Sequence, residues 1–306
     1  MTEHVFSHAP VLGTVLTVSV ARVDLGVARA IDRRVLDEVE RLEAMLSRFR
    51  ADSALERWKR DELAVVPLEL GEVLARSAVW MKRTRGVLNP RSGALVERWR
   101  AASEEGRVPS SAELRPVLDE LASPGFEVDE AGIPRRVGDC THLDLHAFAK
   151  GWIVDRALST ATGAAPAAAV LVSAGGDIAR IGPGAAAVAI EDPLRPYDNA
   201  APVDRVMLRR GGLATSGVAR RGIRVGARTY SHIVNPRTGF PADGAVSVSV
   251  VAPSAEAADA WATALSLASA HELVHVADDA GVAAMAVLHG GAMVANDRWC
   301  RLQSPR

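Results

Sequence analysis

The stretch AAVLVSAGGDIARIGPGAAAVAIE, residues 168–191, decides the fold class of this chain. It predicts two strands, 168–174 and 187–191, with a tight turn at Gly175-Gly176 behind the first of them. Because strands that follow one another directly favour antiparallel pairing, the pattern indicates an α+β fold. The segments downstream extend this pattern, with strands expected at 205–208, 229–234, 245–251, 283–288 and 292–296 and a helix at 255–269.

Upstream of this stretch, helices alternate with loops. Residues 14–20 alternate in polarity like a half-buried strand, and apolar residues from Ile31 to Phe49 recur every three or four positions, as on one face of a helix. Further helices are expected at 70–85, closed by Gly86, and at 112–121 and 148–162. A length of 306 residues allows one large domain or two closely packed halves, 1–142 and 143–306.

Composition excludes several classes of function. The formal charge is −1, from 36 Lys+Arg and 37 Asp+Glu, so no basic field is available to hold a nucleic acid. Cys140 and Cys300 lie outside any CxxC pattern, which argues against a disulfide framework or a thiolate metal site. We see no secretory signal and no apolar run of 18 residues, and we therefore expect a cytoplasmic protein with no membrane partner.

The helix expected at 255–269 carries two oxygen groups on one otherwise apolar face. Asp259 and Thr263 are four residues apart and lie amid alanines. A carboxylate and a hydroxyl are hard ligands of the kind that suits Mg²⁺. The alternative is structural: Asp259 would be a first-turn acid near the positive end of the helix, and Thr263 a buried hydroxyl bonded back to it.

A second candidate is DLHAFAKG, residues 144–151, which leads from a strand end into a helix. Lys150 stands beside the helix N-terminus, where free amides and an ammonium group make an anion site. A solvated lysine is the alternative. Asp155, one turn further on, can be read as a surface helix acid.

A third candidate is His232, at the end of a strand and before a Pro-Arg-Thr-Gly turn. A histidine at such a rim can act as a general base, although a lone strand histidine is more often structural. Weaker patterns lack a third metal ligand or the G-x-G-x-x-G spacing of a dinucleotide loop; they are His142-x-Asp144-x-His146, the His271/His275 pair and Gly175-Gly176-Asp177.

Taken in order, these motifs and several others resemble the ApbE family, the FAD:protein FMN transferases, over nearly the whole chain. The motifs that carry the resemblance are LGT (12–14), LSRFRADS (46–53), GVLNP (86–90) with Trp99, DLHAFAKGWIVD (144–155), AGGDI (174–178), IEDP (190–193), ATSG (214–217), HIVNPRTGFP (232–241) and ADAWATAL (258–265).

The resemblance implies a single ApbE-like α+β domain over residues 1–306, with flavin held between two strand-rich halves. The implied reaction transfers FMN from FAD to a Thr or Ser hydroxyl of an acceptor flavoprotein and releases AMP. Mg²⁺ would be held by Asp259, Thr263 and the main-chain carbonyl of Ala147, and His232 would occupy the catalytic position. The residues expected to face the FAD are Asp144, Lys150, Leu12, Phe49, Val87, Leu88, Asn89 and Ile233.

The chain departs from the family pattern at positions around the flavin. Leu12 stands where relatives commonly have Met, Leu88-Asn89 where they have Phe-Asp, and Asn235 where they have Asp. His146 replaces a small residue and Lys59 an Asn. Two other functions are compatible with the same residues: an FAD pyrophosphatase that gives FMN and AMP, and a non-catalytic FAD-binding protein.

Overall fold

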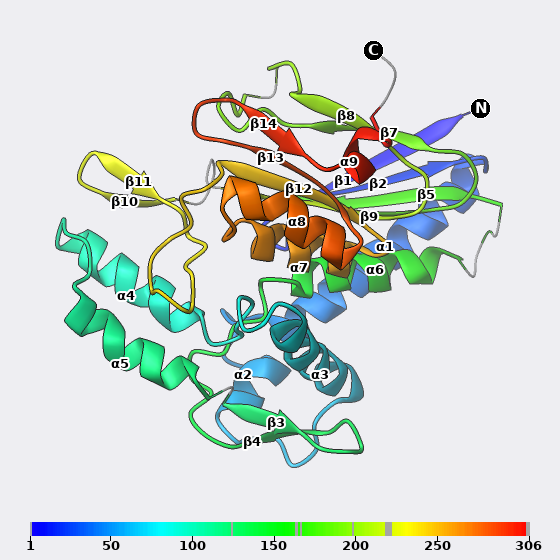
Figure 1. Cartoon of the computed structure of the whole chain (residues 1–306). Coiled ribbons are helices and arrows are strands. Elements are labelled where there is room, and N and C mark those ends of the chain that lie inside the picture. Colours follow the sequence, from blue (N-terminus) through cyan, green and yellow to red (C-terminus); the bar gives the residue numbers. More distant parts are fainter. Residues whose placement is uncertain are drawn as a thin grey trace.

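An eight-stranded antiparallel sheet forms the centre of the fold (Figure 1). The computed structural model describes residues 2–123, 125–162, 165, 167–197, 199–217 and 222–303, and the sheet is built from these. Neighbouring strands all run antiparallel, which confirms the predicted α+β class. The spatial order is β1 (Glu3–Val11), β2 (Thr14–Ala21), β5 (Ala169–Ala174), β6 (Asp177–Ile181), β9 (Gly211–Gly217), β12 (Ser247–Ala252), β13 (Ala283–Val287) and β14 (Met293–Ala295).

The stretch that decides the fold forms a hairpin in the middle of this sheet. β5 and β6 pair with Ala174 opposite Asp177, and both intervening glycines have positive φ, 57° at Gly175 and 102° at Gly176. Glycine adopts these angles without strain. β6 was not predicted, because Asp177 and Arg180 interrupt its apolar pattern; both are nevertheless buried. The sheet joins the two expected halves, since β2 pairs with β5.

Three helices, α1 (Leu25–Leu46), α6 (Ala149–Thr162) and α7 (Ala255–Leu265), pack side by side against one face of the sheet (Figure 1). The predicted stripe of α1 is buried from Ile31 to Leu46. It ends earlier than predicted, because Ser47 is extended and Phe49 is 80% exposed. The helix expected at 255–269 is also shorter: Ser269 and Glu272 form a capping box that starts a separate helix, α8 (Ala270–Ala280).

The opposite face of the sheet is covered by a hairpin and a short helix (Figure 1). β7 (Ala186–Ile190) pairs with β8 (Asp204–Leu208), and α9 (Asp297–Cys300) lies beside them. Apolar side chains of this hairpin pack with Met285, Val287 and Trp299 in a second core.

The remaining elements lie away from the sheet (Figure 1), most of them beyond the helical layer, whereas the small hairpin of residues 223–230 lies beside the sheet. They are α2 (Ala54–Lys59), α3 (Leu68–Arg83), α4 (Gly93–Glu104), α5 (Ser111–Leu121), and the small sheets β3 (Phe126–Val128) with β4 (Pro134–Arg136) and β10 (Ile223–Val225) with β11 (Arg228–Tyr230). Trp99 and Leu114 centre a third core in this region. The strand expected at 229–234 ends at Tyr230. Among the described residues, no helix combines the length and apolar character needed to span a bilayer.

Candidate functional site

The first residue of α7 is held between two glycines. A Cβ on Gly151 of α6 would meet the carbonyl oxygen of Ala255 and lie 2.6 Å from its carbonyl carbon. A Cβ on Gly212 of β9 would meet the backbone of Ala255 and lie 2.5 Å from the carbonyl carbon of Ser254. Because real side chains do not tolerate such contacts, both glycines are required for the close approach of α6, α7 and β9.

Asp155 fixes the same junction through hydrogen bonds. Its carboxylate accepts the backbone N–H of Ala255 at 2.9 Å and of Glu256 at 2.8 Å, and so caps α7 from the side of α6. Burial raises the pKa of Asp155, although these two hydrogen bonds act in the opposite direction. The reading of Asp155 as a surface acid is therefore wrong: it sets the position of α7 relative to α6.

Asp259, the fifth residue of α7, lies next to the N-terminus of α6. Its side chain is buried, and Oδ2 accepts the backbone N–H of Gly151 at 3.1 Å. Thr263, one turn later, lies with its Oγ1 3.2 Å from Oγ of Ser216 at the end of β9. Asp259 is thus bonded to a neighbouring helix, and the recorded partner of Thr263 is a strand hydroxyl. The structural alternative expected Asp259 to interact with the N-terminus of its own helix and Thr263 to bond back to that helix, and neither contact described here is of that kind.

Lys150 brings a positive charge to the same helix N-terminus. Its Nζ lies 2.7 Å from Oδ2 of Asp177, which follows the Gly175-Gly176 turn and is 2% exposed. The solvated alternative for Lys150 is wrong, because its side chain is only 21% exposed and ion-paired. The junction thus combines helix amides, one ammonium group and the carboxylates of Asp155, Asp177 and Asp259.

Asp144 stands at the centre of a second polar group, just before α6. Arg48 Nη1 lies 3.2 Å from its Oδ2, and His146 contacts Oδ1 through both its ring and its backbone N–H. Burial alone would raise the pKa of Asp144, but the hydrogen bonds and charge of His146 and the charge of Arg48 lower it below its ordinary value. Ala147, half-buried, lies between this group and α6.

Phe49 presents an exposed aromatic ring beside this group. The guanidinium carbon of Arg48 is 4.8 Å from the ring centroid of Phe49, and the ring of His146 lies 6.3 Å away. At this same, C-terminal end of α1, Leu12 lies in the β1–β2 turn with a φ of 52°, and its N–H donates to Glu43 at 3.0 Å.

The loop after α3 reaches Asp144 through its backbone. The N–H of Asp144 donates to the carbonyl of Pro90 at 2.6 Å. Val87 is half-buried, whereas Leu88 is 5% exposed and packs in the main core. The side chain of Asn89 donates to the carbonyl of Leu121 and accepts from the N–H of Arg91.

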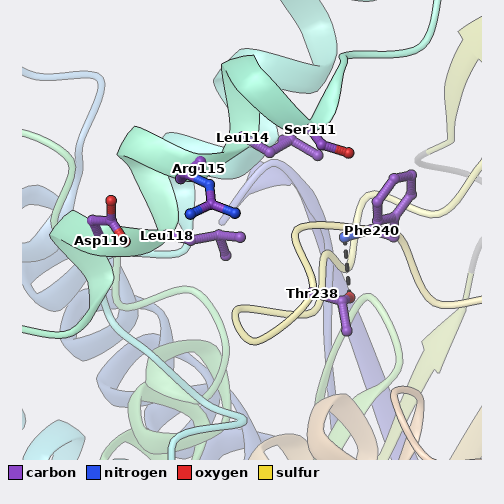
Figure 2. Close-up of a pocket in the computed structure, with 7 residues that line it drawn as sticks. All are labelled: Ser111, Leu114, Arg115, Leu118, Asp119, Thr238 and Phe240. Carbon is purple, nitrogen blue, oxygen red and sulfur yellow. Dashed lines mark hydrogen bonds between the residues drawn. The ribbon is translucent and has the colours of Figure 1, made fainter.

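His232 and Ile233 begin a hairpin-like turn whose tip packs on the outlying helices. Both are half-buried, and the N–H of Ala242 donates to the carbonyl of Ile233 at 2.8 Å. At the tip, Arg237 donates to the carbonyl of Arg85 at 2.6 Å, which links this turn to the loop after α3. Thr238 and Phe240 border a cavity of about 240 Å³ with Arg115 of α5 (Figure 2).

The contacts described above gather some of the predicted residues into two groups, whereas His232 and Ile233 lie in a turn that is linked to the second group through Arg237 and Arg85. Asp259, Thr263 and Lys150 meet at the α6–α7–β9 junction, and Asp144 with Phe49 forms the neighbouring group that the loop after α3 connects to the 232–242 turn. Across the described ranges, no cluster of three or more His, Cys, Asp or Glu side chains is arranged to hold a metal. Sequence reasoning missed Arg48, Asp177 and Ser216 as members, although all three lie inside the motifs that carried the resemblance.

Comparison with known proteins finds relatives of this chain by sequence and by fold. The ApbE family model matches residues 12–286. An FAD:protein FMN transferase of Treponema pallidum is 31% identical over 277 residues, 83% of this chain and 76% of that protein. A Rhodobacter capsulatus protein of the same name is 34% identical over 215 residues, but the match spans 66% of this chain and 39% of that longer protein.

A solved structure, the ApbE protein of Thermotoga maritima, superposes with a TM-score of 0.88 at 26% identity, covering 99% of this chain and 100% of that one. The fold, the order of motifs and the sequence relatives lead to one conclusion: the chain belongs to the ApbE family.

Proposed function

We propose that this chain is a magnesium-dependent FAD:protein FMN transferase, which moves FMN from FAD to a Thr or Ser hydroxyl of an acceptor protein and releases AMP. The observation that carries the proposal is the junction of α6, α7 and β9. There the buried carboxylate of Asp259, two hydroxyls, helix amides and a lysine that is paired with Asp177 lie in hydrogen-bonding contacts. Such a set suits the diphosphate of a dinucleotide together with its cation.

The residues at the junction fit Mg²⁺. Asp259, Thr263 and the main-chain carbonyl of Ala147 would hold it, because Mg²⁺ commonly takes one or two carboxylates and completes its shell with water and substrate phosphates. One carboxylate is therefore enough, and a three-carboxylate cluster is not required. When bound, the ion would neutralise charge on the diphosphate.

The flavin and adenosine regions are expected along the second group. The exposed ring of Phe49, backed by Arg48, offers a face on which a planar ring can stack. Leu12, Val87 and Ile233 would add apolar contacts, and Asp144 polar ones. Since the side chain of Leu88 is buried and that of Asn89 serves the backbone, we expect these two residues to contribute main-chain atoms to the wall.

His232 would accept the proton of the acceptor hydroxyl. The hydroxyl oxygen then forms a bond to the FMN phosphorus while the bridging P–O bond breaks and AMP departs. Lys150, placed at the helix N-terminus, would hold the diphosphate in position for this displacement.

The test is to incubate the protein with FAD and Mg²⁺, with and without a candidate acceptor such as a co-encoded flavoprotein. We expect an acceptor Thr or Ser to gain the mass of FMN while AMP is released in equal amount. If free FMN is released to the same extent with the acceptor present, and the acceptor gains no covalent flavin, the protein is an FAD pyrophosphatase. Bound FAD without turnover would assign an FAD-binding protein. Cell fractionation tests the expected cytoplasmic location.

A further inference from the structure

A second cleft, of about 430 Å³, opens further along α6, where that helix meets the start of α7 and the β8–β9 turn. Its volume lies in the range of small-ligand sites. Its lining includes none of the residues assigned above to flavin, metal or proton transfer. The cleft borders the α6–α7–β9 junction through Asp155 and Ser254, but a ligand in it would contact none of the residues assigned to flavin, metal or proton transfer.

Positive charge in this cleft exceeds the negative charge that the described residues supply. Two of its carboxylates are ion-paired: Glu256 with Arg76 at 2.7 Å, and Glu72 with Arg76 at 3.1 Å and Arg156 at 3.7 Å. The third, Asp155, is used by the amides of α7. Two arginines of the lining, Arg180 and Arg210, remain without a carboxylate partner in the described part of the chain.

Arg180 is the more unusual of the two, because its guanidinium is buried, with only 4% of the residue exposed. Its recorded hydrogen bonds all go to neutral carbonyls: Gly182 at 3.3 Å, Pro183 at 2.8 Å, and Arg209. Carbonyl oxygens orient a guanidinium but do not balance its charge, and a buried cation without a counter-charge is costly.

Arg22 adds another cation at the same place. The Nη2 atoms of Arg22 and Arg180 lie 3.9 and 4.0 Å from the point that a Cβ on Gly184 would occupy. Burial and the proximity of Arg22 both lower the pKa of Arg180. The guanidinium groups of Arg22 and Arg180 thus approach each other beside the exposed turn at Gly184. Because glycine has no side chain, space remains between the two groups.

We propose that the exposed arginines near Arg180 bind the phosphate group of a small phosphorylated ligand at this end of the cleft: Arg210, which follows the residue whose carbonyl Arg180 holds, and Arg22, which meets Arg180 over Gly184. The charge of the buried Arg180 adds to the attraction. Guanidinium groups bind phosphate through paired, charge-assisted hydrogen bonds. A dianion at this point supplies the counter-charge that the described residues lack, and the cleft accommodates the rest of the ligand.

The experiment titrates inorganic phosphate, and separately AMP, into the full chain by calorimetry. FAD and Mg²⁺ are both kept saturating and no acceptor is added, so that the flavin site is occupied and FMN has no acceptor. We expect saturable binding of both ligands. Tighter binding of AMP would identify a nucleotide as the ligand class, whereas equal binding would show that phosphate is sufficient.

Variants decide whether the binding belongs to this site. Arg180 also holds three carbonyls, and its replacement risks misfolding, so the exposed Arg22 and Arg210 carry the test. Arg22→Ala and Arg210→Ala should each weaken phosphate binding about tenfold, the effect of losing one charge-assisted hydrogen bond. The matched control is Arg100→Ala on α4, which should bind like the wild type. No saturable binding, or equal affinity in all three variants, would overturn the proposal.

Discussion

Gly151→Ala tests whether the close contact of α6 and α7 positions the site. The added methyl would lie 2.6 Å from the carbonyl carbon of Ala255 and 2.8 Å from the N of Glu256. Ordinary carbon contacts are about 3.5 to 4.0 Å, so the helices must separate by about 1 Å. The recorded hydrogen bond from Gly151 to Asp259 would then lengthen beyond its present 3.1 Å.

The magnitude follows from three contributions. Overpacking costs about 1–3 kcal/mol, and weakening a hydrogen bond to a buried carboxylate about 1–2 kcal/mol more. Replacing glycine by alanine inside a helix returns about 1 kcal/mol. The net loss is about 2 kcal/mol, which for a chain of 306 residues lowers the melting temperature by about 3 °C. A displacement of this size at a reacting centre also lowers the rate about 100-fold.

The matched control is Gly71→Ala in α3, where the new methyl meets only Cδ of Pro134 at 3.6 Å. This contact is ordinary, so helix propensity should raise the melting temperature by about 1 °C without changing the rate. Both variants are compared by calorimetry and by AMP release from FAD in the presence of acceptor. A Gly151→Ala protein with wild-type melting temperature and full activity would refute the reasoning.

Asp259→Ala should abolish FMN transfer and raise the Mg²⁺ concentration needed for half-maximal FAD binding. Thr263→Ser keeps a hydroxyl at this position and should transfer FMN and respond to Mg²⁺ like the wild type. A magnesium titration followed by flavin fluorescence measures the response of both variants. His232→Ala should lower the transfer rate about 100-fold or more with FAD affinity unchanged, and equal loss of FAD binding would contradict its role as a base. Because the folded-state pKa of Asp155 is raised, its contribution to stability is fully present below its unfolded pKa of about 4 and is lost as pH rises through the raised value. Asp155→Asn should therefore remove this part of the pH dependence. The check is to measure the free energy of unfolding of both proteins by denaturant between about pH 4 and 8. If the two proteins show the same dependence on pH, the assignment to Asp155 is wrong.

Polarity patterns were enough to predict much of the fold. The strand at 14–20, the buried stripe of α1 and the succession of strands after residue 168 were predicted correctly, because one face of each element must be apolar to join a core. The pattern missed several strands, among them β1, β6 and β9. In β6 buried Asp177 and Arg180 interrupt it, and in β9 glycines replace the apolar residues where α7 approaches. An alternating polarity pattern cannot predict a strand whose residue types are determined by contacts with segments far away in the sequence.

The sequence by itself determined which oxygen-bearing side chains share a face of α7, since Asp259 and Thr263 are separated by about one helical turn. Only the tertiary structure decided what that face meets. Gly151 and Gly212 admit the start of α7 between α6 and β9, Asp155 holds it there, and Asp259 is thereby brought to the N-terminus of α6. The physical reason is that helical spacing is a local property, whereas hydrogen bonds between residues about a hundred positions apart exist only after the chain has packed.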